Sequence, residues 1–197
     1  GNTSESFNYC WEQLDSAEIT SSNFGPNNQT GALARSVLPR SNPKRIIPNL
    51  DRVLKSELTE ENPGMFDDWE TVPMVGRTIN WGLTVRKQTT SLSQVAQDKI
   101  EITSIANAGP FTMDSQNQFG NIIKGGSLEE ILWSVEGTDQ SPINALSVNI
   151  LLSTDGGSTF PIVLAESVPN NGSAQVIIPN GVDTTNARIK IKPVSNI

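Results

Sequence analysis

Residues 148–164 read VNILLSTDGGSTFPIVL, which is an alternating apolar run, a glycine-containing turn and a second apolar run. Successive side chains of a strand point to opposite faces, so this alternation fits strands with one buried face. The same alternation recurs at 131–135, 174–178 and 187–192. Short strands between regular turn residues are typical of a β-sandwich.

The first half of the chain is less regular. Alternation predicts strands over 7–12, 77–86 and 97–105. Residues 19–48 are rich in Asn, Pro, Ser and Gly and follow no period, as expected of a long loop or of a segment held against a sheet. Asn49 is a plausible N-cap for a short helix through Leu50 to Leu58.

These patterns predict an all-β fold made of two tandem Ig-like antiparallel β-sandwich domains. The expected N-terminal sandwich covers residues 1–107 and includes the long loop and the short helix. The expected C-terminal sandwich covers residues 108–197. Gly109-Pro110 lies at the predicted hinge, since Gly and Pro interrupt regular structure.

Composition excludes several classes of function. The 197 residues include no histidine and one cysteine, Cys10, and the formal net charge is −7. Histidine-based acid–base catalysis, a Ser-His-Asp triad and an internal disulfide are therefore excluded. The acidic balance disfavours nucleic acid as a partner. No apolar run approaches the roughly 20 residues of a membrane-spanning helix. We expect no cofactor.

One turn matches the Asp-box pattern S-x-D-x-G-x-x-F. Its residues are Ser153, Asp155, Gly157 and Phe160. The aspartate should accept backbone N–H bonds across the turn while glycine takes a positive φ. The motif also occurs in carbohydrate-active proteins, so a sugar-facing loop is the alternative to a purely structural turn.

The segment MFDDWE at 65–70 places Asp67, Asp68 and Glu70 around two aromatic residues. Carboxylate oxygens could hold calcium, although the spacing differs from that of an EF-hand loop, so solvated loop charge is favoured. A pair of catalytic carboxylates for glycoside hydrolysis is a less favoured interpretation of this cluster than a calcium site. Trp69, the only tryptophan predicted to lie on a loop, is the candidate for binding a sugar.

A basic stretch lies between residues 35 and 55. Its side chains are expected to be solvated arms, with an anionic partner as the alternative. The six residues are Arg35, Arg40, Lys44, Arg45, Arg52 and Lys55.

Five sequence blocks follow one another along the chain: YCWEQ (9–13), WETVP (69–73), RTINWGLTVR (77–86), GPFT (109–112) and VNILLSTDGGSTFP (148–161). They resemble the C-terminal accessory region of secreted bacterial reprolysin-like zinc metallopeptidases. That family's zinc site lies on an HExxH helix upstream, so no catalytic residue carries over to this chain. After Arg86 the chain has Lys87-Gln88 where the family tends to have Asp-Asn.

The resemblance implies a non-enzymatic accessory region of a secreted or cell-surface metallopeptidase-like protein, acting as a spacer or as a substrate- or surface-binding module. Its implied partners are a protein or polysaccharide at the cell surface and an upstream catalytic domain. A cell-adhesion or carbohydrate-binding module without a protease is the alternative, and a carboxylate-based hydrolase is a third.

The resemblance also implies a fragment that lacks family strands before Phe7 and after Ile197. We then expect residues 21–48 to cover one sheet edge of the first domain. We expect the strand at 187–192 to form an exposed edge.

Overall fold

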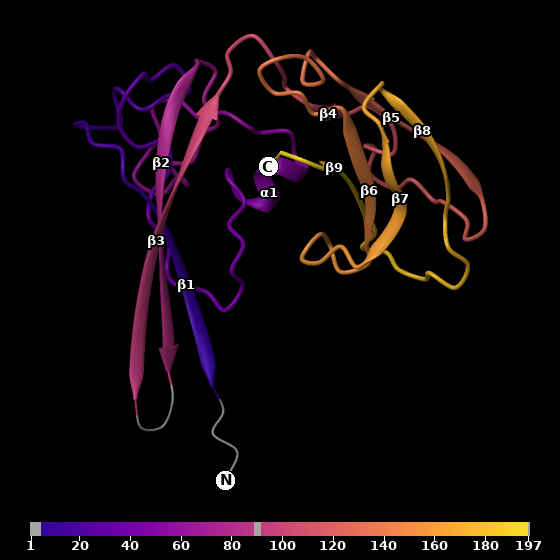
Figure 1. Ribbon diagram of the computed structural model, residues 1–197, viewed down its shortest axis with the longest axis horizontal. Coiled ribbons are helices and arrows are strands. Elements are labelled where there is room, and N and C mark those ends of the chain that lie inside the picture. The colour runs from indigo at the N-terminus through magenta and orange to yellow at the C-terminus, as the bar shows by residue number, and fades with distance from the viewer. Residues whose placement is uncertain (1–4, 89–91, 197) are drawn as a thin grey trace. The chain divides into compact units, whose positions relative to one another are not determined.

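The computed structural model describes residues 5–88 and 92–196 (Figure 1). Its described residues form three antiparallel sheets of three strands each and one short helix, which confirms the all-β prediction. The chain divides into two compact units, Gly1–Ala106 and Asn107–Ile197.

The sheet of the first unit has the order β1-β2-β3, formed by β1 (Ser6–Gln13), β2 (Arg77–Gln88) and β3 (Ser93–Ser104). The pairing of β2 with β3 runs without interruption from Arg77↔Ser104 to Gln88↔Ser93. One face packs on a small core, since Ile79 and Trp81 are less than a tenth exposed. The strands continue beyond this core as an arm (Figure 1).

Residues 14–76 of the first unit contain one helix, α1 (Leu50–Leu54). The Asn49 side chain accepts a hydrogen bond from the backbone N–H of Arg52, as the predicted N-cap requires. The predicted helix is longer than the observed one, which ends at Leu54.

A second sheet was expected in this unit, but its described residues form a single sheet. Leu33, Ala34 and Ile47 from the irregular segment pack against the core instead. Prolines at 26, 39, 43 and 48 explain the difference, because proline lacks the N–H that a ladder strand donates.

The irregular segment also pairs with the outer edge of β1. Tyr9 N–H donates to the Arg40 carbonyl at 2.7 Å, and Arg40 N–H donates to the Tyr9 carbonyl at 2.9 Å. The expectation that residues 21–48 cover an edge is confirmed at this position.

The second unit consists of two three-stranded sheets around a shared core. One sheet has the order β4-β5-β8, formed by β4 (Thr112–Met113), β5 (Leu128–Ser134) and β8 (Ser173–Ile177). The other has the order β7-β6-β9, formed by β7 (Ile162–Pro169), β6 (Ser147–Ser153) and β9 (Arg188–Pro193).

Both sheets contribute buried side chains to this core. The central strands β5 and β6 supply Ile131, Val148 and Ile150, each 0% exposed. β9 lies at the edge of its sheet and is more exposed than β6 beside it, as expected for the strand at 187–192.

A buried polar contact anchors this core. Trp133 Nε1 donates to Asn170 Oδ1 at 2.7 Å, and Asn170 Nδ2 donates to the Ala145 carbonyl at 2.8 Å. Trp133 is 3% exposed and Asn170 is 5% exposed. A buried indole N–H without a partner would destabilise the fold, so Asn170 allows the tryptophan to be buried in full.

Candidate binding site

The loop at residues 62–70 is fixed at its base by backbone contacts. Asn62 N–H donates to the Phe24 carbonyl at 3.0 Å, and Arg35 N–H donates to the Trp69 carbonyl at 3.0 Å. Pro63 between them is fully buried. The loop therefore starts and ends on chain segments far from it in sequence.

The tip of this loop is a tight turn closed from within. Asp67 Oδ2 accepts the Gly64 N–H at 2.6 Å, and Trp69 Nε1 donates to the Gly64 carbonyl at 2.8 Å. Such side-chain-to-backbone bonds stabilise a turn without a strand or helix. The two residues enclosed by the turn, Met65 and Phe66, are 78% and 95% exposed.

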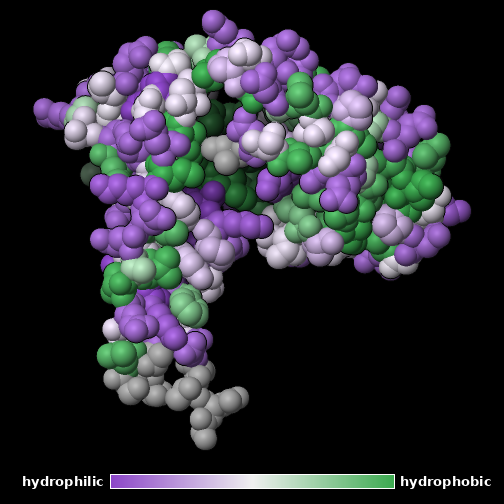
Figure 2. Space-filling model, in the orientation of Figure 1, coloured by the Kyte–Doolittle hydropathy of each residue, from purple (hydrophilic) through white to green (hydrophobic). Residues whose placement is uncertain are grey.

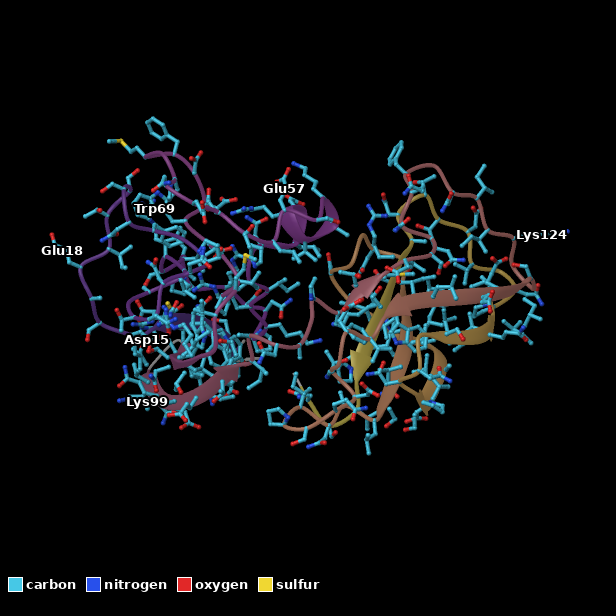
Figure 3. All side chains as sticks on the ribbon, turned by 90° about the horizontal axis from the view of Figure 1, so that it is seen from above. Asp15, Glu18, Glu57, Trp69, Lys99 and Lys124 are labelled. Carbon is cyan, nitrogen blue, oxygen red and sulfur yellow. The ribbon has the colours of Figure 1, made fainter. Side chains whose placement is uncertain are left out.

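Trp69 supports the loop more than it presents a surface. The Arg35 guanidinium lies over its ring at 4.9 Å, and the Phe24 ring packs 5.4 Å from it. A sugar that stacked on Trp69 would compete with this guanidinium. Figure 3 labels Trp69 among the side chains of the first unit.

The three carboxylates predicted as weak calcium ligands bond to three different groups. Asp67 accepts from Gly64, Asp68 accepts from the Asn49 side chain at 2.7 Å, and Glu70 accepts from Arg45 at 2.7 Å. Within residues 5–88 and 92–196, no group of three acidic or sulfur ligands is placed to hold a metal ion. These carboxylates serve as turn, cap and ion-pair acceptors.

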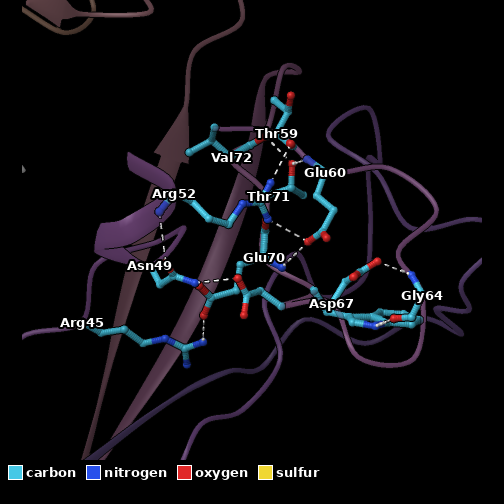
Figure 4. A network of polar contacts seen from close by, with 12 residues as sticks. Arg45, Asn49, Arg52, Thr59, Glu60, Gly64, Asp67, Glu70, Thr71 and Val72 are labelled. Atoms are coloured by element: carbon cyan, nitrogen blue, oxygen red, sulfur yellow. Dashed lines mark hydrogen bonds and ion pairs between the residues drawn. The ribbon is translucent and has the colours of Figure 1, made fainter. Parts of the chain in front are cut away.

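Glu70 and Arg45 form the most buried of the ion pairs around the loop (Figure 4). Their side chains are 6% and 8% exposed. Arg45 also donates to the carbonyls of Trp11 and Arg35, each at 2.6 Å, and its guanidinium lies 5.2 Å from the Trp81 ring centre. One arginine thus connects β1, β2 and the base of the loop.

A second ion pair lies beside the first. Arg52 donates to Glu60 at 2.8 Å, to the Glu70 carbonyl at 2.8 Å and to the Thr59 carbonyl at 2.8 Å. Glu60 in turn accepts the Glu70 N–H at 3.1 Å. These contacts tie α1 to both ends of the segment that carries the loop.

The expectation of solvated basic arms is wrong for two of its six residues. Arg45 and Arg52 lie in the ion pairs described above. An open groove beside α1 is lined by basic and acidic side chains together: Arg40, Arg52, Lys55, Asp51, Glu57, Glu60, Asp67 and Asp68. Its mixed charge gives no preference for an anionic partner.

Sequence reasoning also missed Asp15, which follows β1. Partial burial raises the pKa of its carboxyl, but hydrogen bonds from Asn80 and Gln13 and the charge of Arg77 outweigh burial, so the pKa is lowered overall. Its oxygens accept from the Asn80 backbone at 3.1 Å and from the Asn80 amide at 2.8 Å. Asp15 therefore ties the end of β1 to β2.

The Asp-box turn lies in the second unit. Asp155 accepts from the Ser153 hydroxyl at 2.6 Å and from the Thr159 N–H at 2.9 Å. Gly157 has φ +97° and donates its N–H to Ser153 Oγ at 2.9 Å. The bonds from Ser153 and Thr159 lower the pKa of the Asp155 carboxyl from 3.8 to about 2. Phe160 is half-buried, and Lys190 lies 4.7 Å from its ring centre.

Comparison with protein-family models, with curated proteins and with solved structures gave no match. The likeness to metallopeptidase accessory regions therefore depends on the quoted sequence blocks alone. None of the helices in the described part of the chain is long and apolar enough to cross a membrane.

Proposed function

We propose that this chain is a non-catalytic binding region of a secreted or cell-surface protein of the metallopeptidase type, and that Met65 and Phe66 are its contact residues. The observation that carries the proposal is their exposure, 78% and 95%, at the tip of a turn closed by hydrogen bonds. Large apolar side chains held in water favour association, because binding removes their surface from solvent. We also propose that the two sheets of the second unit pack as in an Ig-like β-sandwich.

A fixed tip favours binding for a second reason. A loop that is already ordered loses little conformational entropy when it binds. The Arg45–Glu70 and Arg52–Glu60 pairs hold the base of this loop from several sides. The same arrangement suits a spacer that holds an attached domain at a set distance.

The chemistry around the tip defines the partner. Asp67 and Asp68 follow Phe66 directly, and both are exposed. A complementary protein surface would offer an apolar cavity for Phe66 with Lys or Arg at its rim. Polysaccharide binding is the second candidate, because the nearly fully exposed Phe66 ring offers an aromatic face to a sugar.

The experiment measures binding of the purified chain to immobilised gelatin and casein, to bacterial cell envelopes and to a glycan array. The variant Met65→Ser/Phe66→Ser removes the tip. The matched control Leu38→Ser/Met74→Ser removes two other apolar side chains of the same unit, 84% and 62% exposed.

Loss of a binding signal in the tip variant alone supports the proposal, and the surface on which it is lost separates protein from polysaccharide. Equal binding of both variants to every surface would overturn the assignment of Met65 and Phe66. Turnover of casein or gelatin by the repurified chain would overturn the non-catalytic assignment.

A further inference from the structure

The outer edge of β3 is the longest open strand edge in the described part of the first unit. β3 spans 12 residues and pairs with β2 on one side only. Ten of those residues, 93–101 and 103, are exposed. Figure 2 shows apolar and polar side chains interspersed along this arm, and Figure 3 places Lys99 at the margin of the unit.

The direction of the β3 backbone groups follows from the ladder. Tyr9 exchanges both of its backbone hydrogen bonds with Arg40, so these groups point away from β2. Val85 of β2 lies opposite Tyr9, so the backbone groups of Val85 do not bond to β1 and point toward β3 instead. There they face Ala96, whose own backbone groups therefore point toward β2. The β3 residues with outward backbone groups are therefore Val95, Gln97, Lys99, Glu101 and Thr103.

Little in β3 protects this edge. Proteins commonly blunt an edge strand with proline, with a bulge or with a covering segment, as Arg40 covers Tyr9 of β1. β3 contains no proline and its register has no bulge. Among the described residues, this edge carries the charged side chains of Asp98, Lys99 and Glu101, and the exposed Asp98 carboxylate accepts the Lys99 N–H at 2.8 Å.

The sequence of β3 is complementary to itself in one antiparallel register. When two copies of β3 pair antiparallel about a two-fold axis, the residue numbers of every opposite pair add up to the same sum. The outward backbone groups belong to odd-numbered residues, so they face each other only when this sum is even. With Ile100 opposite Ile100, each Lys99 lies opposite Glu101 of the second copy. Two ion pairs then flank two apolar side chains.

Shifted registers lose this match. Centring the pair on Asp98, Lys99 or Glu101 places two like charges directly opposite each other, which is destabilising. Registers centred further along the strand bring no opposite charges together. The charges on β3 thus disfavour the competing registers and favour one.

We infer that the β3 edge binds the β3 edge of a second copy of this chain, antiparallel and centred on Ile100, to form one continuous sheet with three strands from each copy. The contact is isologous and closes after two copies, so it produces a dimer and no fibre. This inference is independent of the proposed function of the loop tip.

The test is analytical ultracentrifugation of the full chain over a micromolar concentration series. Lys99→Glu and Glu101→Lys each turn both ion pairs into like-charge contacts, and each should raise the dimer dissociation constant by about tenfold. The double variant Lys99→Glu/Glu101→Lys restores opposite charges and should return the constant to the wild-type value.

Matched controls make the same changes in charge elsewhere. Arg86→Glu alters the neighbouring strand β2, and Glu130→Lys alters the second unit; neither should change the dimer. Circular dichroism checks that each variant is folded. A Gln97→Pro variant removes one outward N–H without breaking the β2–β3 ladder, and should weaken the dimer at unchanged charge.

Three results would overturn the inference. They are a wild-type chain that stays monomeric throughout the series, single variants that leave the dimer unchanged, and a double variant no better than the singles. Slower hydrogen exchange of residues 93–104 at high concentration is expected for the paired edge, and exchange independent of concentration would contradict it.

Discussion

Arg45 Nη2 lies 2.7 Å from Glu70 Oε1, with both side chains less than a tenth exposed, although the two residues are 25 positions apart in the chain. Within the irregular residues 14–76, the pair holds Arg45, near the middle, against Glu70, near the end. Residues 55–76 contain no described helix or strand, so their path is fixed by side-chain contacts of this kind together with the backbone contacts at the base of the loop. The exposed tip at Met65 and Phe66 depends on that path.

Replacing Glu70 with alanine should destabilise the first unit by about 3–5 kcal/mol, because the buried Arg45 charge loses its partner. Urea unfolding followed by tryptophan fluorescence measures the change. Glu57→Ala, at an exposed position after α1, is the matched control and should cost less than about 0.5 kcal/mol. Equal effects of the two substitutions would show that the ion pair does not hold the segment.

Asn170→Ala should destabilise the second unit by about 1–3 kcal/mol, because Trp133 Nε1 would be buried without an acceptor. The exposed neighbour Asn171 provides the control Asn171→Ala. Near-ultraviolet circular dichroism of the indole band during urea unfolding reports the transition. If both alanine variants unfold at the wild-type midpoint, the Trp133–Asn170 contact contributes little to the core.

Asp155→Ala should lower the unfolding temperature of the second unit at neutral pH without changing any binding signal of the chain. The carboxylate accepts bonds from Ser153 and Thr159 that alanine cannot accept. Differential scanning calorimetry measures the shift, with Asp183→Ala at an exposed site as the control. A wild-type melting temperature in the Asp155 variant would refute the structural role of the turn.

The contribution of Asp155 should also depend on pH. Its folded-state pKa is about 2, below the usual 3.8, so folding favours the ionised form. The stabilisation is therefore complete above about pH 4 and is lost as the pH falls through about 2. The difference in melting temperature between wild type and Asp155→Asn should shrink across this window. A difference that stays constant from pH 6 to pH 2 would contradict the assignment of the low pKa.

The strands were predictable because their signal is local. Alternation at 148–152 and 187–192 depends only on neighbouring residues; the observed β6 covers the first run, and β9 covers the second from Arg188 onward. Boundaries were less accurate: β3 begins at Ser93, four residues before its predicted start, because the exposed arm has no buried face to impose alternation.

The candidate site was predictable only in position. The sequence pointed to residues 65–70 through their carboxylates and Trp69, whereas the proposed contact residues are the exposed apolar side chains of Met65 and Phe66. Phe24 and Arg35, which pack on Trp69, and Arg45, which pairs with Glu70, all come from the aperiodic segment. No periodic pattern predicts such contacts, since they depend on how the segment crosses the sheet.

The proposed binding role requires that the loop holds Met65 and Phe66 in a fixed conformation. Heteronuclear ¹⁵N relaxation of the purified chain measures it directly, through the order parameters of these two backbone amides. We expect values near those of the β2 amides, about 0.85, because the turn is closed by Asp67 and Trp69. Values below about 0.6 at Met65 and Phe66 would mean that the tip is flexible, and would contradict its proposed role as a preformed binding surface.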